Sequence, residues 1–370
     1  MCGIEEYLNE NFKANKTRIT YRAILNGYFQ VIGEPPETYF KNGRKDEDFL
    51  NDLKKYINTS LSGRPSKTCL SYISAVRTYM RHNKVKLDPE DIKTIIKRNK
   101  GMGSNRPLTK DRPPSYVEIR QILTHGETVE KTFYLCLLSS GMRIGELCGI
   151  KIQNVYMNEN PVRIDIPSTE TKNGQRRTTF ISNEAKNFLI EWFKVRQGYM
   201  QLVNERTKNL PTNMKMKITD NDNRVFPFSA LTAWKRWGKM CKRAGFTERD
   251  TQTNRAVLHP HGLRKFFRTH MGTKIGVDFT EEILGHSGYL VGEYRIHTDR
   301  ELGDAYLTGM GTVTVFEREI AQDLTNVNEQ LKERNEEIKE LQVKVANMER
   351  EREVILGLRR QMEELIKPQK

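Results

Sequence analysis

Apolar residues recur at intervals of three and four in both halves of the chain. In the first such stretch they occupy positions 21, 24, 25, 28 and 32. In the second, Cys69, Tyr72, Ile73, Val76 and Met80 share one side of a helix that we expect Ser66 to cap. Residues 117–123 and 132–138 repeat the spacing. The chain is therefore predicted to be mainly helical.

One region follows a different pattern, in which apolar and polar residues alternate. The segments 162–166 and 176–181 alternate, and a polar turn with Gly174 separates them. Alternation of this kind predicts a β-hairpin, with Lys172 at its tip. The expected fold class is α+β: mainly helical with a small β-sheet.

The last 54 residues carry a third pattern, a heptad repeat of about four turns. Its seam consists of Ile320, Leu324, Val327, Leu331, Ile338, Leu341, Val345 and Met348, and Arg334 fills one seam position. The register degrades after Gly357. The pattern predicts a coiled-coil oligomerisation tail at 317–370, and the alternative is a single long helix that folds back on the body.

Charge separates this tail from the rest of the chain. The 62 Lys and Arg exceed the 47 Asp and Glu, for a formal net charge of +15. Residues 317–370 hold 13 acidic and 11 basic residues, so the positive charge belongs to the body. Such a body suits a polyanionic partner, although ribosomal and membrane-surface proteins share this composition.

A short basic segment divides the body. Between 97 and 112 six basic residues face one acidic residue, and glycines and prolines interrupt them. This composition does not form a core and predicts an extended linker close to phosphates. The expected organisation is a helical domain at 1–96, a linker at 97–113, a larger domain at 114–316 and the tail.

Other classes of protein fit the sequence poorly. No stretch reaches 18 consecutive apolar residues, and the N-terminus has no signal-peptide pattern, so we expect no membrane association and a cytoplasmic, nucleoid-associated location. The five cysteines form no Cys-x-x-Cys pair and are odd in number. We therefore expect reduced, mostly buried cysteines, no metal site and no cofactor.

Six residues of the larger domain have side chains suited to one phosphate. They are Arg143, Lys172, His261, Arg264, His286 and Tyr294. Direct attack on a phosphodiester needs a hydroxyl nucleophile, cations over the non-bridging oxygens and an acid for the leaving oxygen. Arginine suits the clamp because its planar fork donates two parallel hydrogen bonds and stays charged. A phosphate held in this way can be attacked without a metal.

The order and local frames of these residues resemble the catalytic domain of tyrosine recombinases, the phage-integrase family. Arg143 lies in Ser-Gly-Met-Arg-Ile-Gly-Glu, His261 and Arg264 lie in His-Gly-Leu-Arg, and His286 lies in Leu-Gly-His-Ser. The string Tyr-Arg-Ile-His-Thr that begins at Tyr294 is similar to archaeal members. Each frame alone is weaker, since an Arg-x-x-Glu is a common helical ion pair.

The resemblance implies a role for each residue. Tyr294 is the nucleophile, Arg143 and Arg264 neutralise the transition state, and His286 bonds a non-bridging oxygen. Lys172 gives a proton to the leaving 5′ oxygen, and His261 assists proton transfer at the tyrosine. Glu146 would support Arg143 without being catalytic.

Two other tyrosines compete with Tyr294 for the nucleophile role. Tyr289 is only three residues from His286, which we take to be too close. Tyr306 lies in an apolar helical pattern with Leu302 and Met310, where core packing is the better account.

The N-terminal helices resemble the core-binding domain that grips DNA in the same family. A structural bundle with basic faces is the alternative. The predicted DNA-contacting residues are Lys67, Arg77, Arg81, Lys97, Arg98, Lys100, Arg106, Lys110, Arg112, Arg176 and Arg177.

The sequence thus predicts a metal- and ATP-independent DNA strand-exchange enzyme that integrates or excises a mobile element. Its expected partners are double-stranded DNA, further copies in a tetramer on DNA assisted by the coiled coil, and an accessory protein. The alternatives are a type IB topoisomerase-like enzyme, a telomere resolvase and a catalytically inactive DNA-binding accessory protein.

Overall fold

The computed structural model describes residues 3–41, 43–98, 112–171, 174–209, 218, 222–251, 253–286 and 297–317, with scattered residues between 330 and 362. The chain divides into two compact units, Met1–Lys110 and Asp111–Lys370. The roles expected for the segments within these units stay predictions.

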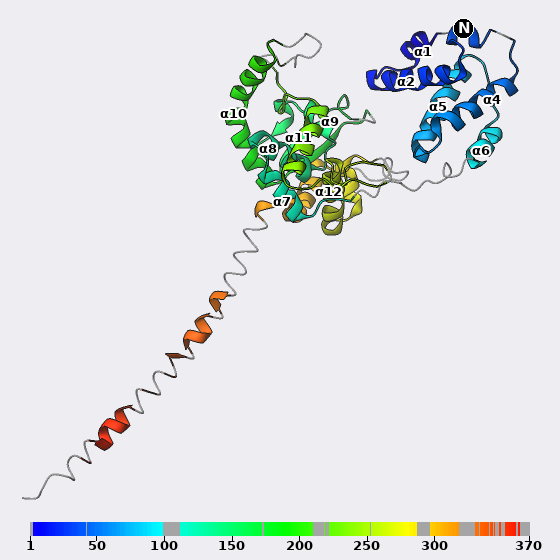
Figure 1. Ribbon diagram of the computed structural model, residues 1–370. Coiled ribbons are helices and arrows are strands. Elements are labelled where there is room, and N and C mark those ends of the chain that lie inside the picture. The colour runs from blue at the N-terminus through cyan, green and yellow to red at the C-terminus, as the bar shows by residue number, and fades with distance from the viewer. Residues whose placement is uncertain are drawn as a thin grey trace, which may run out of the picture. The chain divides into compact units, whose positions relative to one another are not determined.

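The first unit is helical (Figure 1). Its elements are α1 (Ile4–Asn11), α2 (Asn15–Ile32), α3 (Pro36–Tyr39), α4 (Asp46–Tyr56), the π-helix η1 (Ile57–Leu61), α5 (Ser66–His82) and α6 (Pro89–Arg98). α2 packs against α1, α4 and α5, and a buried aromatic cluster that includes Tyr7, Tyr28, Tyr39 and Tyr79 fills the centre.

The two helices predicted in this unit are confirmed as α2 and α5, but the expected cap is wrong. Pro65 is the N-cap of α5, and Ser66 is its first helical residue, without a side-chain cap bond. The predicted apolar face is correct, since Cys69, Ile73 and Val76 are buried. α6 runs to Arg98, two residues beyond the predicted end of the helical domain at residue 96.

The second unit combines helices with one small sheet. Its helices are α7 (Tyr116–Thr124), α8 (Thr128–Ser140), α9 (Ile144–Gly149), η2 (Ile152–Asn154), α10 (Asn183–Thr207), α11 (Ala230–Arg243), α12 (His261–Ile275), α13 (Val277–Leu284), α15 (Asp299–Gly309) and η3 (Met310–Val313). α8 is buried along most of its length and packs against α7, α10 and α12 (Figure 1).

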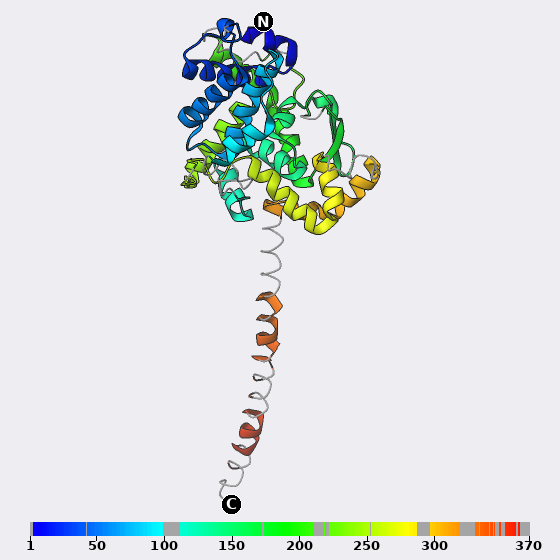
Figure 2. The same ribbon diagram turned by 90° about the vertical axis from the view of Figure 1, so that its right-hand side faces the viewer.

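The sheet is antiparallel, with strand order β1 (Val155–Tyr156), β2 (Val162–Ile166) and β3 (Arg177–Ile181). The predicted hairpin is confirmed by β2 and β3, whose register pairs Val162 with Ile181 and Ile166 with Arg177. The two-residue strand β1 was not predicted. β3 contacts α8, α13 and α15, so the green hairpin lies beside the yellow helices that follow residue 261 (Figure 2).

The segment 317–370 is helical at the positions that the structure describes between 330 and 362. The seam residues Leu331, Ile338, Leu341 and Met348 are each at least 50% exposed in this single chain. The predicted pairing of two such helices therefore stays a prediction.

Candidate active site

The site is built on the turn between α8 and α9. Gly141 ends α8 in the left-handed conformation, with φ of 61°. An added Cβ would lie 2.6 Å from Phe267 and 2.7 Å from Leu284, so the turn is tightly enclosed. Glycine meets both demands because it has no Cβ. Two residues later the chain enters α9 at Arg143.

Arg143 is the N-cap of α9, and Glu146 closes the cap. The Arg143 backbone N–H donates to Glu146 Oε2 at 2.7 Å, and its Nη1 donates to Oε1 at 2.8 Å. The Glu146 side chain is 2% exposed, whereas that of Arg143 is 32% exposed. The buried carboxylate thus fixes one edge of a guanidinium whose remainder faces outward.

Arg177 was predicted to contact DNA, and in the structure its side chain is paired within the protein, so the DNA contact stays a prediction. Its Nη1 and Nη2 donate to the two oxygens of Glu146 at 3.1 and 2.7 Å, and its Nε donates to the Ile283 carbonyl at 3.2 Å. Its side chain is only 9% exposed. Burial and bidentate pairing leave this guanidinium little access to a DNA phosphate.

Glu146 stays ionised between its two arginines. Burial would raise the pKa of this carboxyl group, but the hydrogen bonds and charge of Arg177, followed by those of Arg143, hold the pKa below its usual value. Two positive charges therefore share one negative charge at this point of the site.

Arg264 lies on the first turns of α12 and is 4% exposed. It donates to the carbonyls of Gly141 and of Leu284, the latter at 2.7 Å. These carbonyls end α8 and α13, where the helix dipoles place negative partial charge. Burial, followed by the charges of Arg143 and Arg177, lowers the pKa of Arg264 to about 9. It therefore remains charged at neutral pH.

His286 lies next to Arg264 and is held from its other side. Arg264 Nη2 is 2.9 Å from His286 Nε2, and His286 Nδ1 contacts Glu281 Oε2. Since arginine only donates hydrogen bonds, His286 Nε2 is the acceptor of the bond from Arg264. The ring proton is therefore on Nδ1, which donates a hydrogen bond to the carboxylate of Glu281. Arg268 donates to the second oxygen of Glu281 at 2.5 Å.

Glu281 was not among the residues predicted from the sequence. Burial opposes ionisation of its carboxyl group, but bonds from His286 and then Arg268 hold its pKa below the usual value. Its neighbour Glu282 bonds a different histidine, since it accepts from the backbone N–H of His297 at 3.1 Å. Because Glu281 and Glu282 are adjacent and chemically identical, the sequence does not tell which of them contacts His286. The orientation of α13 in the structure decides it.

His261 is the first residue of α12 and is exposed. Its ring is nearly parallel to that of His259, at 8° and 6.3 Å between centroids. Trp234 stacks on His259 at 5.7 Å. His261 is one helical turn from Arg264, but the two side chains differ in burial.

Two of the six predicted catalytic residues, Lys172 and Tyr294, lie outside the described residues, as does the rival Tyr289. The other rival is described: Tyr306 is fully buried and donates to the Ser139 carbonyl at 2.8 Å. Burial raises the pKa of Tyr306 well above its usual value. The prediction that Tyr306 belongs to the core is confirmed.

The remaining predicted DNA contacts fall into three groups. Arg112 and Arg176 are 50% and 66% exposed, and they pair with Glu118 and Asp165. Lys67 and Lys97 are exposed. Lys100, Arg106 and Lys110 lie outside the described residues, and for Arg98 only the helical backbone is described.

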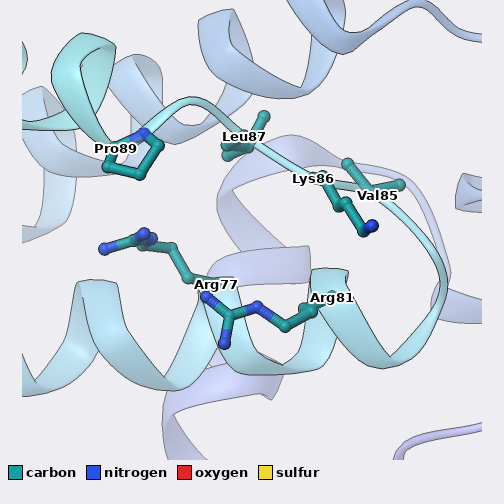
Figure 3. Close-up of a pocket in the computed structure, with 6 residues that line it drawn as sticks. All are labelled: Arg77, Arg81, Val85, Lys86, Leu87 and Pro89. Atoms are coloured by element: carbon teal, nitrogen blue, oxygen red, sulfur yellow. The ribbon is translucent and has the colours of Figure 1, made fainter.

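Arg77 and Arg81 line a cavity of about 230 Å³ in the first unit. Both project from α5 toward the segment Val85 to Pro89, which adds Lys86 and an apolar wall with Leu87 (Figure 3). Three cations around one hollow favour an anionic ligand.

Among the residues that the structure describes, no three His, Cys, Asp or Glu side chains are placed to hold a metal ion. Nor does any helix in these parts have the length and apolar character needed to cross a bilayer. Four of the five cysteines, Cys69, Cys136, Cys148 and Cys241, are free and buried, as predicted.

Comparison with known proteins agrees with this geometry. Residues 115–297 match the phage integrase family. Tyrosine recombinase XerA of Pyrococcus horikoshii is 26% identical over 286 residues, which cover 76% of this chain and 82% of the relative.

Two solved structures share the fold. A lambda integrase tetramer bound to a Holliday junction has a TM-score of 0.50 at 15% identity, covering 80% of this chain and 78% of that one. The Tn1549 transposon integrase in complex with a circular intermediate DNA also has a TM-score of 0.50 at 15% identity, covering 82% and 97%. The chain belongs to the phage integrase family and is a tyrosine recombinase.

Proposed function

We propose that this enzyme is a site-specific DNA recombinase that integrates or excises a mobile element through a 3′-phosphotyrosyl intermediate. The observation that carries the proposal is the hydrogen bond between Arg264 and His286 beside the turn that presents Arg143. Two arginines and a histidine at one place suit a phosphate with a developing negative charge. Its likeness to a transposon integrase complex supports the mobile-element role.

The reaction exchanges one phosphate ester for another. The Tyr294 hydroxyl oxygen attacks the scissile phosphorus, the bond from phosphorus to the 5′ oxygen breaks, and a 3′-phosphotyrosine forms. His261 assists removal of the tyrosine proton, and Lys172 gives a proton to the 5′ oxygen. A 5′ hydroxyl of a second duplex then attacks the phosphotyrosine and releases Tyr294. The ester bond is conserved, so no ATP is consumed.

His286 needs a change of protonation to take part. Its Nδ1 proton is committed to the ionised Glu281, and its Nε2 accepts from Arg264. When a phosphate oxygen takes the place of this contact, Nε2 must donate, which makes the ring an imidazolium with Glu281 as its counterion. Arg264 is then free to turn one nitrogen to the phosphate.

DNA is bound by both units in this proposal. In the first unit the cavity between α5 and the segment Val85 to Pro89 receives backbone phosphate through Arg77, Arg81 and Lys86. The active assembly in this proposal is a tetramer that joins two duplexes, and the similar fold of a lambda integrase tetramer bound to a Holliday junction supports it. The tail adds contacts between copies.

The test is covalent capture of the intermediate. Purified protein is incubated, without metal or ATP, with nicked duplexes of randomised sequence, and protein–DNA adducts are resolved on a denaturing gel. A nick traps the adduct because the short cleaved strand diffuses away. The wild type and Tyr289→Phe are expected to form the adduct, and Tyr294→Phe is expected to lose it. An adduct that persists in Tyr294→Phe would reassign the nucleophile, whereas its absence from all three proteins would favour an inactive accessory protein.

A further inference from the structure

Arg177 has all three of its side-chain nitrogens bonded within the protein, yet the proposed reaction gives it no task. These nitrogens donate hydrogen bonds to two partners, the carboxylate of Glu146 and the carbonyl of Ile283. Arg143 bonds the same carboxylate through the side-chain nitrogen Nη1 and is 32% exposed. The guanidinium of Arg177 is thus paired with Glu146, whereas that of Arg143 keeps most of its donors toward the outside.

We propose that Arg177 is a positioning residue: it takes up the charge of Glu146, so that Arg143 remains available to the scissile phosphate. This inference rests on the proposed function. A carboxylate and a guanidinium prefer the two-pronged pairing that Glu146 now makes with Arg177. Without Arg177, the same carboxylate would draw Arg143 into that pairing and compete with the phosphate.

The net charge of the cluster leads to the same conclusion. Arg143, Arg177 and Glu146 together carry one positive charge, and the buried Arg264 adds another. Removal of Arg177 would leave Arg143 and Glu146 as a neutral pair. The phosphate would then meet one net positive charge in place of two. The loss is large because charges attract each other more strongly in a site of low polarity than in water.

Arg177 also links the part of the site that holds Arg143 to the part that holds His286. Its Nε bond to Ile283 ties β3 to the last turn of α13, two residues before the turn glycine Gly285. A Cβ on Gly285 would lie 2.4 Å from Arg177 Cδ, so the arginine stem packs directly beneath the residue before His286. One side chain therefore sets Arg143 and His286 relative to each other.

The experiment compares the single-turnover rate of adduct formation among variants of Arg177 and Glu146. Arg177→Gln is expected to slow the rate about 100-fold, the typical cost of losing one electrostatic contact in a transition state. Arg177→Gln combined with Glu146→Gln is expected to recover at least tenfold, because no carboxylate remains to neutralise Arg143. Arg177→Lys, which keeps the charge, should fall between the wild type and Arg177→Gln.

Arg163→Gln is the matched control, since Arg163 is a part-buried arginine of the neighbouring strand β2 that pairs with Glu159 and Asp165. It should cleave at the wild-type rate. Thermal unfolding of each variant separates loss of fold from loss of rate. Should Arg177→Gln fail to fold, the double variant and Arg177→Lys still carry the test, because neither leaves a buried charge without compensation.

Two outcomes would overturn the inference while the wild type still forms its adduct. One is a double variant as slow as Arg177→Gln, which would show that Arg177 acts independently of Glu146. The other is a DNA affinity whose salt dependence drops by about one phosphate contact in Arg177→Gln, which would make Arg177 a DNA ligand. Failure of the wild type to form an adduct would count against the proposed function itself.

Discussion

Arg264 and Arg177 show two ways of keeping a buried guanidinium charged. Arg177 is balanced by the carboxylate of Glu146, whereas Arg264 is balanced by the carbonyls that end α8 and α13. A carboxylate carries a full negative charge on one group, whereas the two helix ends supply about half a charge each. Arg264 is therefore held without an ionised side chain that would repel an incoming phosphate, whereas Arg177 bonds directly to one.

The same reasoning makes Glu281 important to His286. Glu281→Gln keeps the size of the side chain but removes its charge, so the contact to Nδ1 no longer supports a positively charged ring. A hydrogen bond to a charged group contributes about 1.5–3 kcal/mol, which predicts a rate of adduct formation lower by roughly 10- to 100-fold. DNA affinity, measured by fluorescence anisotropy, should change less than about twofold.

Glu130→Gln provides the comparison for this variant. Glu130 lies on α8 and pairs with Arg236 at 3.0 Å, and its side chain is similarly buried. Adduct formation by Glu130→Gln should match the wild type. A wild-type rate in Glu281→Gln would mean that Arg264 and the backbone alone orient His286.

At the scale of elements, the turn between α8 and α9 is the least replaceable part of the site. Gly141→Ala would place a methyl group against Phe267 and Leu284 in a left-handed conformation. Conformational strain of about 1–2 kcal/mol and overpacking of about 1–3 kcal/mol predict a loss of roughly 2–5 kcal/mol in the free energy of unfolding. Urea denaturation followed by circular dichroism measures it.

Gly145→Ala, four residues along, is the matched control, because an added Cβ there meets nothing within 4 Å. Gly145 lies within α9, where alanine is the better helix former, so this variant should be neutral or up to about 1 kcal/mol more stable. Equal effects of the two substitutions would show that the turn tolerates a side chain.

The elements that the sequence predicted are those with a long one-sided pattern. α2, α5, α7 and α8 and the hairpin of β2 and β3 repeat their apolar positions often enough to reveal the period. β1 has two residues, too few to show alternation. Ser66 is a good capping residue by type, but Pro65 occupies the cap.

In the candidate site, too, local patterns were predictable from the sequence and contacts between distant residues were not. Arg143, His261, Arg264 and His286 were predicted from residue type and local frame, and the structure places Arg264 beside His286. The pair of Arg177 with Glu146 joins residues 31 positions apart, and neither frame shows which partner an arginine will take. The sequence predicted a DNA contact for Arg177, and its burial against Glu146 could be known only from the structure.

At the scale of the whole molecule, the tail is the feature that the catalytic chemistry does not require. Glu184 of α10 accepts hydrogen bonds from the backbone N–H groups of Val315, Phe316 and Glu317 at 3.0, 2.6 and 3.1 Å. This buried carboxylate fixes the chain where the tail begins. A variant that ends after Glu317 would therefore keep this anchor and the site while losing the heptad repeat.

Removal of residues 318–370 is predicted to reduce self-association without abolishing adduct formation. Each apolar seam residue buried between helices contributes about 1.5–3 kcal/mol, so several of them can hold copies together at micromolar concentration. Sedimentation equilibrium gives the number of copies per particle when the measured mass is divided by the mass of one chain, and this number should be larger for the full chain than for the truncated one. In the full chain, Ile338→Asp should lower this number, whereas Lys339→Asp, one position outside the seam, should not. The same number for all four proteins would mean that the exposed seam binds something other than a second copy, and an unchanged adduct rate in the truncated protein would separate assembly from chemistry.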